Sequence, residues 1–264
     1  MIILTCANKE IMNYKYGPFP KEFSFKEVIS ETVKKANKFG YVPFVYDLGS
    51  LGIGEKYYID DASFQNNGFY EKEVMNGYKS KSLFKPDIVK LCMAKYKDLV
   101  VYLDGDVQLV KRIDEVNTTD YDVGVSLRSP FELETEWHRK HIEIVRYINA
   151  GVILFRPTQT AAKFVDRWHN LTLEIGNDQM ALNQLACPDT YPTENSVITI
   201  DGVRIKYFPC TQYNYYYFDE ELPYKAKLFH FKGTVRHYYP FNFKKGIFCI
   251  TMVLLKKILK PTRK

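Results

Sequence analysis

The chain has 264 residues, of which 46% are hydrophobic and 26% are charged, a composition typical of an ordinary globular protein. It has no internal repeat and no low-complexity tract, which excludes repeat arrays and largely disordered chains. The net charge of +6 is uneven, because residues 1–221 hold 26 basic and 31 acidic residues, whereas residues 222–264 hold 11 basic residues and no acidic one. A basic tail of this kind indicates an anionic partner such as phosphate, a lipid surface or nucleic acid.

The cysteines and the N-terminus bear on the compartment. The five cysteines are odd in number and show no CxxC spacing, which favours reduced thiols in the cytosol over a disulfide framework. The first ten residues lack the positive region and the long apolar stretch of a signal peptide. We therefore expect a cytoplasmic protein.

The first 50 residues alternate between strand and helix patterns. Residues 25–39 carry apolar side chains at helical spacing, and Gly40 suits the position after the end of a helix. Strand, helix, strand is the repeating unit of a parallel α/β sheet. The flanking segments are assigned as strands at 2–5 and 42–46, a turn at 6–8 and a loop at 9–24.

The alternation continues to the end of the chain. Residues 84–96 predict a helix with Pro86 in its first turn, whereas residues 50–80 look irregular. His138 and His141 could bind a metal, but the charged residues beside them favour a solvated helix face. The remaining expected elements are strands at 97–110, 121–127, 152–155, 203–208 and 228–233 and helices at 160–173 and 180–185.

The strongest chemical signal is the sequence KDLVVYLDGDVQLV at residues 97–110, where an apolar run leads into Asp104, Gly105 and Asp106. The run suits a strand buried on both faces of a parallel sheet, and such sheets bind ligands beyond the carboxyl ends of their strands. Unpaired carboxylates are too costly to bury, and glycine allows a sharp turn and close approach of a ligand. A divalent cation bridged to phosphates would satisfy the two carboxylates. The alternative is a solvated turn.

Several motifs occur in the order found in a known family. They are Leu-Thr-x-x-Asn at residues 4–8, Lys85 before proline, VVYLDGDV, NAGVILFRP, DQMALNQ and HFKG at residues 230–233. On these motifs the chain resembles GT-A type nucleotide-sugar glycosyltransferases, most closely glycosyltransferase family 8, which includes glycogenin and lipopolysaccharide galactosyltransferases. The resemblance implies a Rossmann-like α/β fold with a mixed, mostly parallel central sheet flanked by helices. It predicts a single domain at 1–240 and a basic, apolar tail at 241–264.

The resemblance also implies a metal site. Asp104 and Asp106 would hold Mn²⁺ or Mg²⁺, with His230 as the third protein ligand. Two carboxylates and an imidazole suit Mn²⁺, and the donor diphosphate would complete its coordination. The metal would neutralise charge on the departing nucleoside diphosphate. The alternative for His230 is a core histidine bonded to backbone.

Further roles follow from the same resemblance. Asp178 and Gln179 would face the sugar near its anomeric carbon, although either could instead serve only the start of a helix. Lys85 would contact the diphosphate, or be a helix-surface lysine. The other expected donor-binding residues are Leu4, Thr5 and Asn8 at the nucleoside, Asn149, Ala150 and Gly151 at the sugar, Lys232 and Arg236 at the phosphates, and Gly105 and Gly233 without an assigned contact.

The late motif departs from the family pattern His-x-x-Gly-x-x-Lys-Pro-Trp. Arg236 stands at the lysine position, where it can still grip a phosphate, and Tyr238, Tyr239 and Pro240 replace the aromatic platform. This difference leaves the acceptor contacts open.

The expected activity is metal-dependent transfer of a sugar from a nucleotide sugar, specifically a UDP-sugar, to a glycan or glycolipid acceptor. The family retains anomeric configuration, and no second carboxylate stands out as a nucleophile, which favours front-face attack. The main alternative is a non-catalytic nucleotide-sugar or carbohydrate-binding protein on a degenerate transferase fold. A haloacid-dehalogenase-type phosphatase is disfavoured because Gln108 replaces its usual Thr or Val. No nucleic-acid-binding motif is present, so no nucleic-acid partner is expected.

The tail combines an apolar stretch at residues 246–255 with Lys256 and Lys257. Ten apolar residues are too few to span a bilayer, which takes about 20. The pattern fits a segment lying on an anionic membrane surface, and equally a C-terminal helix packed on the core with a solvated basic end.

Overall fold

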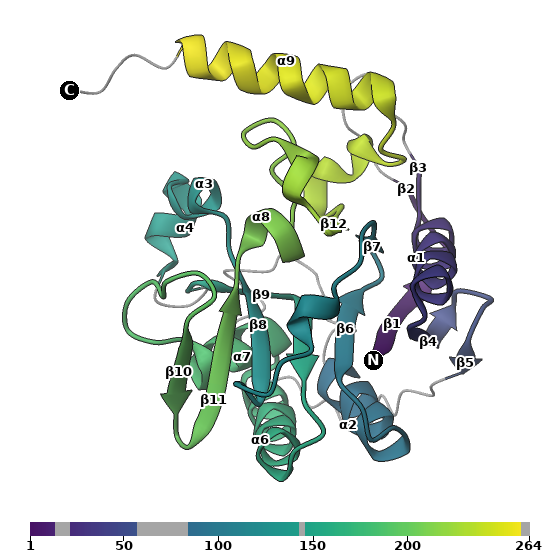
Figure 1. Ribbon diagram of the computed structural model, residues 1–264, viewed down its shortest axis with the longest axis vertical. Coiled ribbons are helices and arrows are strands. Elements are labelled where there is room, and N and C mark those ends of the chain that lie inside the picture. The colour runs from purple at the N-terminus through teal and green to yellow at the C-terminus, as the bar shows by residue number, and fades with distance from the viewer. Residues whose placement is uncertain (14–21, 57–83, 143–145, 260–264) are drawn as a thin grey trace.

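The computed structural model describes residues 1–13, 22–56, 84–142 and 146–259 (Figure 1). Its centre is an eight-stranded sheet with the strand order β10-β11-β8-β9-β6-β1-β4-β5. The strands are β1 (Ile2–Lys9), β4 (Val42–Ser50), β5 (Glu55–Lys56), β6 (Val100–Asp104), β8 (Val123–Leu127), β9 (Ile148–Phe155), β10 (Val197–Ile200) and β11 (Val203–Phe208).

The sheet is mixed and mostly parallel, as the sequence predicts. Strand β1 lies between β4 and β6 and is parallel to both, and β8 and β11 are also parallel. Strand β9 runs antiparallel between β6 and β8. Two small sheets pair β7 (Val107–Leu109) with β12 (Leu228–His230) and β2 (Ile11–Asn13) with β3 (Glu22–Ser24).

Helices cover both faces of the sheet. α2 (Lys85–Lys95), α6 (Gln159–Ile175) and α7 (Asp178–Ala186) contribute to the core on one face, and α1 (Phe25–Phe39) to the core on the other. α1 begins where Ser24 accepts a hydrogen bond from the Glu27 amide, and it ends at Gly40, whose φ of 78° suits glycine. The shorter helical segments are α3 (Pro130–Leu133), α4 (Glu136–Lys140), α8 (Cys210–Tyr213), η3 (Asp114–Val116), η4 (Pro223–Lys225) and η5 (Gly233–Tyr238).

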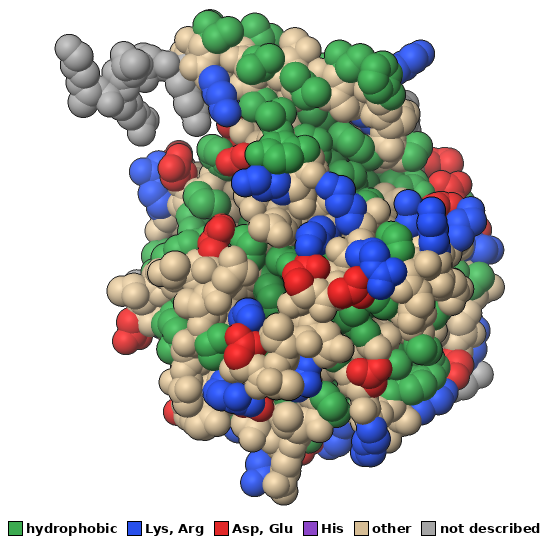
Figure 2. Space-filling model, viewed as in Figure 1, with side chains coloured by type: hydrophobic (Ala, Val, Ile, Leu, Met, Phe, Trp, Pro, Cys, Tyr) green, Lys and Arg blue, Asp and Glu red, His purple; other side chains and the backbone are tan. Residues whose placement is uncertain are grey.

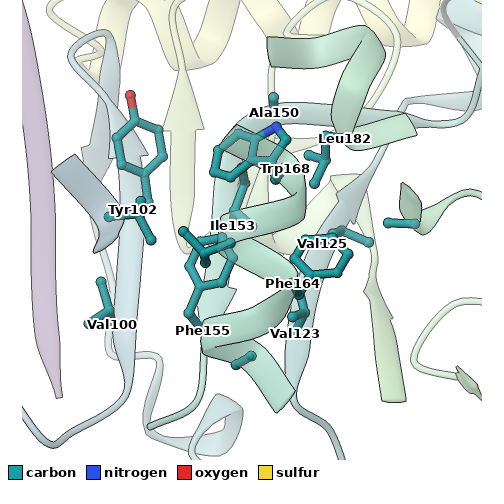
Figure 3. Close-up of a cluster of buried hydrophobic side chains, with 14 of the residues drawn as sticks. Val100, Tyr102, Val123, Val125, Ala150, Ile153, Phe155, Phe164, Trp168 and Leu182 are labelled. Atoms are coloured by element: carbon teal, nitrogen blue, oxygen red, sulfur yellow. The ribbon is translucent and has the colours of Figure 1, made fainter. Parts of the chain in front are cut away.

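The main core packs α6 and α7 against the strands that lead to the site. Figure 3 shows Phe164 and Trp168 of α6 beside Phe155 of β9, and the rings of Trp168 and Phe155 stack at 6.0 Å. The Trp168 indole donates a hydrogen bond to the Asp178 carbonyl at 2.9 Å, because a buried indole N–H needs a partner. This bond fixes the start of α7 relative to α6.

Some sequence-based boundaries are wrong. Residues 6–8 were expected to turn, but they continue β1, because Cys6 pairs with Tyr46 on one side and with Asp104 on the other. Within residues 9–24, expected as a loop, the structure shows the β2–β3 pair. Strand β9 begins at Ile148 rather than Val152, so the Asn-Ala-Gly motif lies inside the strand. Of residues 50–80, expected to be irregular, residues 57–80 lie outside the described residues.

His138 also differs from expectation. It was placed on a solvated helix face, but its side chain is buried, and Nε2 lies 3.1 Å from the Arg146 carbonyl oxygen. Burial lowers its pKa, which favours the neutral ring. Trp137 and His141 on the same segment are not buried. His138 is thus a structural histidine, and the metal role that the sequence disfavoured gains no support.

The C-terminal segment forms α9 (Phe243–Leu259), which lies across one end of the molecule beyond α8 and β12 (Figure 1). Cys249 and Val253 are its buried side chains, and Lys256 pairs with Asp219 and Glu220 at 2.9 and 2.7 Å. Among the described residues, no helix combines the length and hydropathy needed to cross a membrane.

Candidate active site

The two aspartates sit at the end of β6 in a tight turn. Asp104 is the last residue of β6 and pairs with Cys6 of β1. A Cβ on Gly105 would lie 2.6 Å from the Cys6 carbonyl oxygen, so only glycine lets the turn approach β1 this closely. The Asp106 carbonyl accepts a hydrogen bond from the Phe231 amide at 2.9 Å. Backbone contacts therefore hold the aspartates beside the end of β12.

Asp104, Asp106 and His230 converge. Each offers one ligand atom, and these atoms lie within 4.8 Å of one another. Asp106 and His230 are buried, and Asp106 Oδ1 is 3.2 Å from His230 Nε2. Burial raises the pKa of Asp106, but His230 and Arg236 outweigh burial and hold this pKa well below its usual range. The Asp106 side chain is therefore a carboxylate.

Asn214 sets the orientation of His230. Its Nδ2 donates to Ser126 Oγ and Asn149 Oδ1, each at 3.0 Å, which leaves its Oδ1 as an acceptor 2.7 Å from His230 Nδ1. Nδ1 therefore donates to Asn214, and Nε2 faces the two aspartates, where it would coordinate a metal ion in place of a proton. Sequence reasoning missed Asn214, which lies in the aromatic run YNYYYF without any motif around it.

Lys85 links two acidic residues. Its Nζ lies 2.9 Å from Asp104 Oδ1 and 2.9 Å from Asp178 Oδ2. Burial lowers the pKa of Lys85, but the two carboxylates outweigh burial and keep the pKa above its usual value. Asp104 also accepts a hydrogen bond from the Tyr102 hydroxyl at 2.8 Å. Lys85 is thus a largely buried, charged residue of the site rather than a helix-surface lysine.

Arg236 holds the other aspartate. Its Nη2 lies 2.6 Å from Asp106 Oδ2, and its guanidinium carbon lies 5.5 Å from the centre of the Phe23 ring. Arg236 belongs to η5, which begins at Gly233, whose φ is 54°. The arginine that departs from the family motif therefore enters the aspartate site.

The Asn-Ala-Gly motif packs against His230. A Cβ on Gly151 would lie 2.4 Å from His230 Cε1, so glycine makes room for the imidazole ring. Asn149 Oδ1 accepts hydrogen bonds from the Gly151 amide and from Asn214. Ala150 donates its amide to Gln179 Oε1 at 2.8 Å. The close approach that Gly151 permits is used here by the His230 ring, and the expected contact of the motif with a donor sugar stays a prediction.

Gln179 and Asp178 open α7 next to this strand. Besides accepting from Ala150, Gln179 donates from Nε2 to the Ile148 carbonyl at 2.6 Å. The N-cap of α7 is Asn177, whose side chain accepts a hydrogen bond from the Met180 amide. Asp178 is therefore not the helix cap, which was the alternative to a role at the sugar. Its carboxylate turns to Lys85 instead.

The other predicted residues lie around this centre. Leu4 and Thr5 of β1 are buried, Leu4 in the main core, and Asn8 is half-buried further along the strand. The ion-pair partner of Lys232 is Glu132, at 3.0 Å, rather than either aspartate. The Nζ of Lys232 stands 3.6 Å from the centre of the Tyr216 ring.

A pocket of about 390 Å³ adjoins this centre. Tyr216 forms part of its wall, and the Tyr216 ring lies edge-on to the His230 ring at 6.1 Å. The pocket is lined by Glu132, Tyr216, Tyr217, Asp219, Lys232, Gly233, Thr234 and Val235.

The chemistry of the donor set fits a divalent cation. Two carboxylates and an imidazole with a fixed Nε2 are ligands that suit Mn²⁺, and oxygen-rich sets also suit Mg²⁺. An open α/β sheet binds its ligands beyond the carboxyl ends of its strands, which is where these two carboxylates lie.

Comparison with known proteins identifies the class. The family model described as nucleotide-diphospho-sugar transferase matches residues 56–238, more than half of the chain, so the chain belongs to this family. It is a nucleotide-sugar-dependent glycosyltransferase with a GT-A fold resembling family 8.

Solved structures share the fold at low identity. One is a glycosyltransferase involved in glycosylation of the major capsid of PBCV-1, with 12% identity, a TM-score of 0.54, and coverage of 90% of this chain and 98% of that chain. Another is an active-site mutant of LgtC, with 15% identity, a TM-score of 0.53, and coverage of 100% of this chain and 98% of that chain. No curated protein sequence matches the chain.

Proposed function

We propose that this protein transfers a sugar from a nucleotide sugar, specifically a UDP-sugar, to a glycan acceptor, and that the transfer depends on Mn²⁺ or Mg²⁺. The observation that carries the proposal is the cluster of Asp104, Asp106 and His230, in which Asn214 turns Nε2 of the imidazole toward the carboxylates. When bound, the metal supplies Lewis-acid stabilisation of the departing diphosphate.

The donor would lie along the carboxyl ends of β1 and β6. Lys85 and Arg236 already stand at the aspartates and would contact the diphosphate. Gly105 allows the turn between the aspartates to pack on β1, and a Cβ on Gly233 would meet open space. The nucleoside would lie along β1, with Thr5 and Asn8 beside it and Leu4 contributing only backbone, because its side chain belongs to the core.

The donor sugar would sit over the start of α7. Asp178 and Gln179 flank the strand that carries Asn149, Ala150 and Gly151. Both the oxygen and the nitrogen of the Gln179 side-chain amide are hydrogen-bonded to the backbone of β9. The first role of Gln179 is therefore to position this strand. Asp178 is held by Lys85 and would face the sugar near its anomeric carbon.

We infer retention of anomeric configuration. No second carboxylate in the described site is placed as a free nucleophile, because Asp178 is paired with Lys85. Front-face attack fits such a site, with the acceptor proton passing to the leaving phosphate. Proton NMR of the first product would show the same anomeric configuration as the donor. An inverted linkage would overturn this part of the proposal.

The acceptor would enter the pocket beside His230. Aromatic faces and carboxylates are the groups that contact sugar rings and their hydroxyls, and the pocket offers Tyr216, Tyr217, Glu132 and Asp219. Lys232 belongs to this wall through its pair with Glu132, so its expected phosphate contact would require it to leave that carboxylate.

Helix α9 supports a membrane-borne acceptor. Its large apolar side chains are widely exposed, and Figure 2 shows them gathered at the end of the molecule where α9 lies. Lysines flank this apolar surface, as in helices that lie on anionic lipid. Asp219 of the pocket wall pairs with Lys256 of α9, so the pocket adjoins this surface. We propose peripheral association and a glycolipid acceptor.

Co-sedimentation with liposomes tests the association. Wild-type protein should pellet with vesicles rich in anionic lipid and remain in solution with neutral vesicles. Ile250→Ser with Leu254→Ser should lower the bound fraction, because both side chains are exposed on α9. Leu91→Ser is the matched control, since Leu91 is an exposed apolar residue on α2. Equal sedimentation of all three proteins would contradict the proposal.

Thermal shift with a panel of nucleotide sugars tests the donor site. A ligand that binds only the folded state stabilises it by about 2.7 kcal/mol at a hundredfold excess over Kd. One donor should raise Tm with Mn²⁺, and this rise should disappear in Asp106→Ala. Absence of a rise with every nucleotide sugar would contradict the proposal.

A further inference from the structure

We propose that Arg236 is a built-in counter-cation of the metal site. In this proposal it holds Asp106 while the site is empty and passes to the diphosphate when the donor binds, which couples metal binding to nucleotide binding. The inference rests on the proposed function, because it takes Asp104, Asp106 and His230 as the metal ligands. It assigns Arg236 a role in positioning and coupling.

The contacts at Asp106 carry the proposal. Arg236 Nη2 lies 2.6 Å from Oδ2, and His230 Nε2 lies 3.2 Å from Oδ1. Both oxygens of this carboxylate therefore have partners from the protein. A metal ion that takes Asp106 as a ligand competes with these partners for the negative charge of the carboxylate, and Arg236 is the partner that carries a full positive charge at all ordinary pH values.

The present position of Arg236 is incompletely satisfied. Within the described part of the chain, its buried Nε has no hydrogen-bond partner. Nη1 makes only a 3.3 Å contact to the Gly233 carbonyl. A buried donor without an acceptor is costly, so an anion that accepts from this edge of the guanidinium would improve its environment. A diphosphate offers such acceptors and suits the planar geometry of arginine.

Lys85 repeats the arrangement at the other aspartate. It stands 2.9 Å from Asp104 Oδ1, but it is also held by Asp178, so it keeps a carboxylate partner when the metal takes Asp104. Arg236 has no second carboxylate within the described residues, since Asp106 is the acidic side chain it pairs with. Of the two cations, Arg236 is therefore the one that loses its carboxylate partner when the metal ion and the donor bind.

A charge count explains the coupling. The described centre holds Asp104, Asp106 and Asp178 against Lys85 and Arg236, which leaves one net negative charge among these five side chains. A divalent cation alone makes the centre positive, and a diphosphate alone makes it strongly negative. The two together bring the charge back close to its original value. Each ligand therefore favours the other, and the coupling is reciprocal.

Calorimetric titration tests the proposal with Mn²⁺ and UDP as probes. For the wild type, Mn²⁺ should bind at least tenfold tighter at saturating UDP than alone. In Arg236→Met, Mn²⁺ alone should bind severalfold tighter than to the wild type, because no internal cation competes for Asp106. The same variant should bind UDP more weakly, and the coupling should fall at least fivefold.

Two variants serve as controls. Arg236→Lys should keep most of the coupling, because it keeps the charge. Arg167→Met should match the wild type, since Arg167 pairs with Asp201 on the surface. Circular dichroism melts of all variants should confirm folding.

The outcomes separate this inference from the proposed function. If folded Arg236→Met binds Mn²⁺ alone no tighter than the wild type and keeps the coupling, the counter-cation role is wrong while the metal site stands. If the wild type binds Mn²⁺ neither alone nor with UDP, both proposals fail.

Discussion

Two largely buried ionic clusters lie near Tyr216, whose ring contacts Lys232 of one cluster and the His230 ring beside the other, and they use similar side chains differently. The aspartate cluster, defined here as Asp104, Asp106, Asp178, Lys85 and Arg236, has more carboxylates than cations. The pocket-wall cluster, defined as Glu132, Arg128 and Lys232, shares one carboxylate between two cations. Glu132 lies 2.7 Å from Arg128 and 3.0 Å from Lys232, and it also accepts from the Tyr216 hydroxyl.

The difference lies in what each cluster lacks. Both oxygens of Glu132 have partners within the protein, and the two cations beside it already balance its negative charge. This cluster therefore does not need a metal ion to neutralise it. The aspartate cluster carries excess negative charge at the end of a strand, beside the Nε2 atom of His230 that faces its carboxylates. We therefore expect changes in the aspartate cluster to alter ligand binding and activity, and changes at Glu132 to alter stability first.

The largest effect is expected from Asp106→Asn. The substitution keeps the shape but removes the charge of a proposed metal ligand, so kcat/KM for the donor should fall by about 1000-fold, corresponding to several kcal/mol of transition-state stabilisation. The measurement is initial-rate kinetics at saturating Mn²⁺. A loss below tenfold would show that the two clusters do not differ as described.

The next effect concerns stability and comes from Glu132→Ala. Removing the carboxylate leaves the half-buried Lys232 without its acidic partner, which should lower the free energy of unfolding by about 3 kcal/mol. Urea denaturation measures this change. Glu136→Ala is the matched control, because the Glu136–Lys140 pair is exposed and should contribute less than about 1 kcal/mol. Equal stability of both variants would contradict the comparison.

A smaller effect on binding is expected from Asn214→Ala. Loss of the hydrogen bond to His230 Nδ1 frees the ring to rotate or change tautomer, and such outer partners typically affect metal affinity by roughly 10–100-fold. Titration of Mn²⁺ at saturating UDP measures the change. Asn242→Ala, a change at the start of α9, should leave the affinity unaltered. An unchanged affinity in Asn214→Ala would mean that Asn214 does not orient a metal ligand.

The smallest effect is a pH dependence of stability. Burial raises the pKa of Glu132, but Lys232 and Arg128 outweigh it and lower the pKa to about 2, from an ordinary value of 4.5. A lowered pKa stabilises the fold above pH 4.5, and this stabilisation is lost as the pH falls toward 2. Between about pH 5 and 3 the loss should be about 1–2 kcal/mol in the wild type. Glu132→Gln should show a flatter profile in the same urea melts, and parallel profiles would contradict the assignment.

The sequence predicted the part of the site that rests on local patterns. An apolar run ending in Asp-Gly-Asp located the end of β6. The order of the motifs, which matches that of the family, predicted that His230 lies beside the two aspartates. Asn214 could not be found this way, because its role depends on a hydrogen bond between residues that only the fold brings together. The same holds for Glu132 and Lys232, which are 100 residues apart in the chain.

The fold shows a similar division. Long periodic segments such as α1 and α6 were predicted closely, since a helix of several turns repeats its pattern. Short strands were missed, including β2, β3 and β10, because three or four residues carry no measurable period. The turn expected at residues 6–8 failed for a related reason, since pairing with two neighbours overrides local preference.

The most direct test of the account is release of nucleoside diphosphate from a panel of nucleotide sugars, with Mn²⁺ and with a chelator. The account predicts that one donor is cleaved, slowly with water and faster with a sugar acceptor, and that the chelator or Asp106→Asn abolishes release. Tight binding of a nucleotide sugar with no cleavage of any donor under either condition would contradict it, and would instead support a binding protein on a degenerate transferase fold.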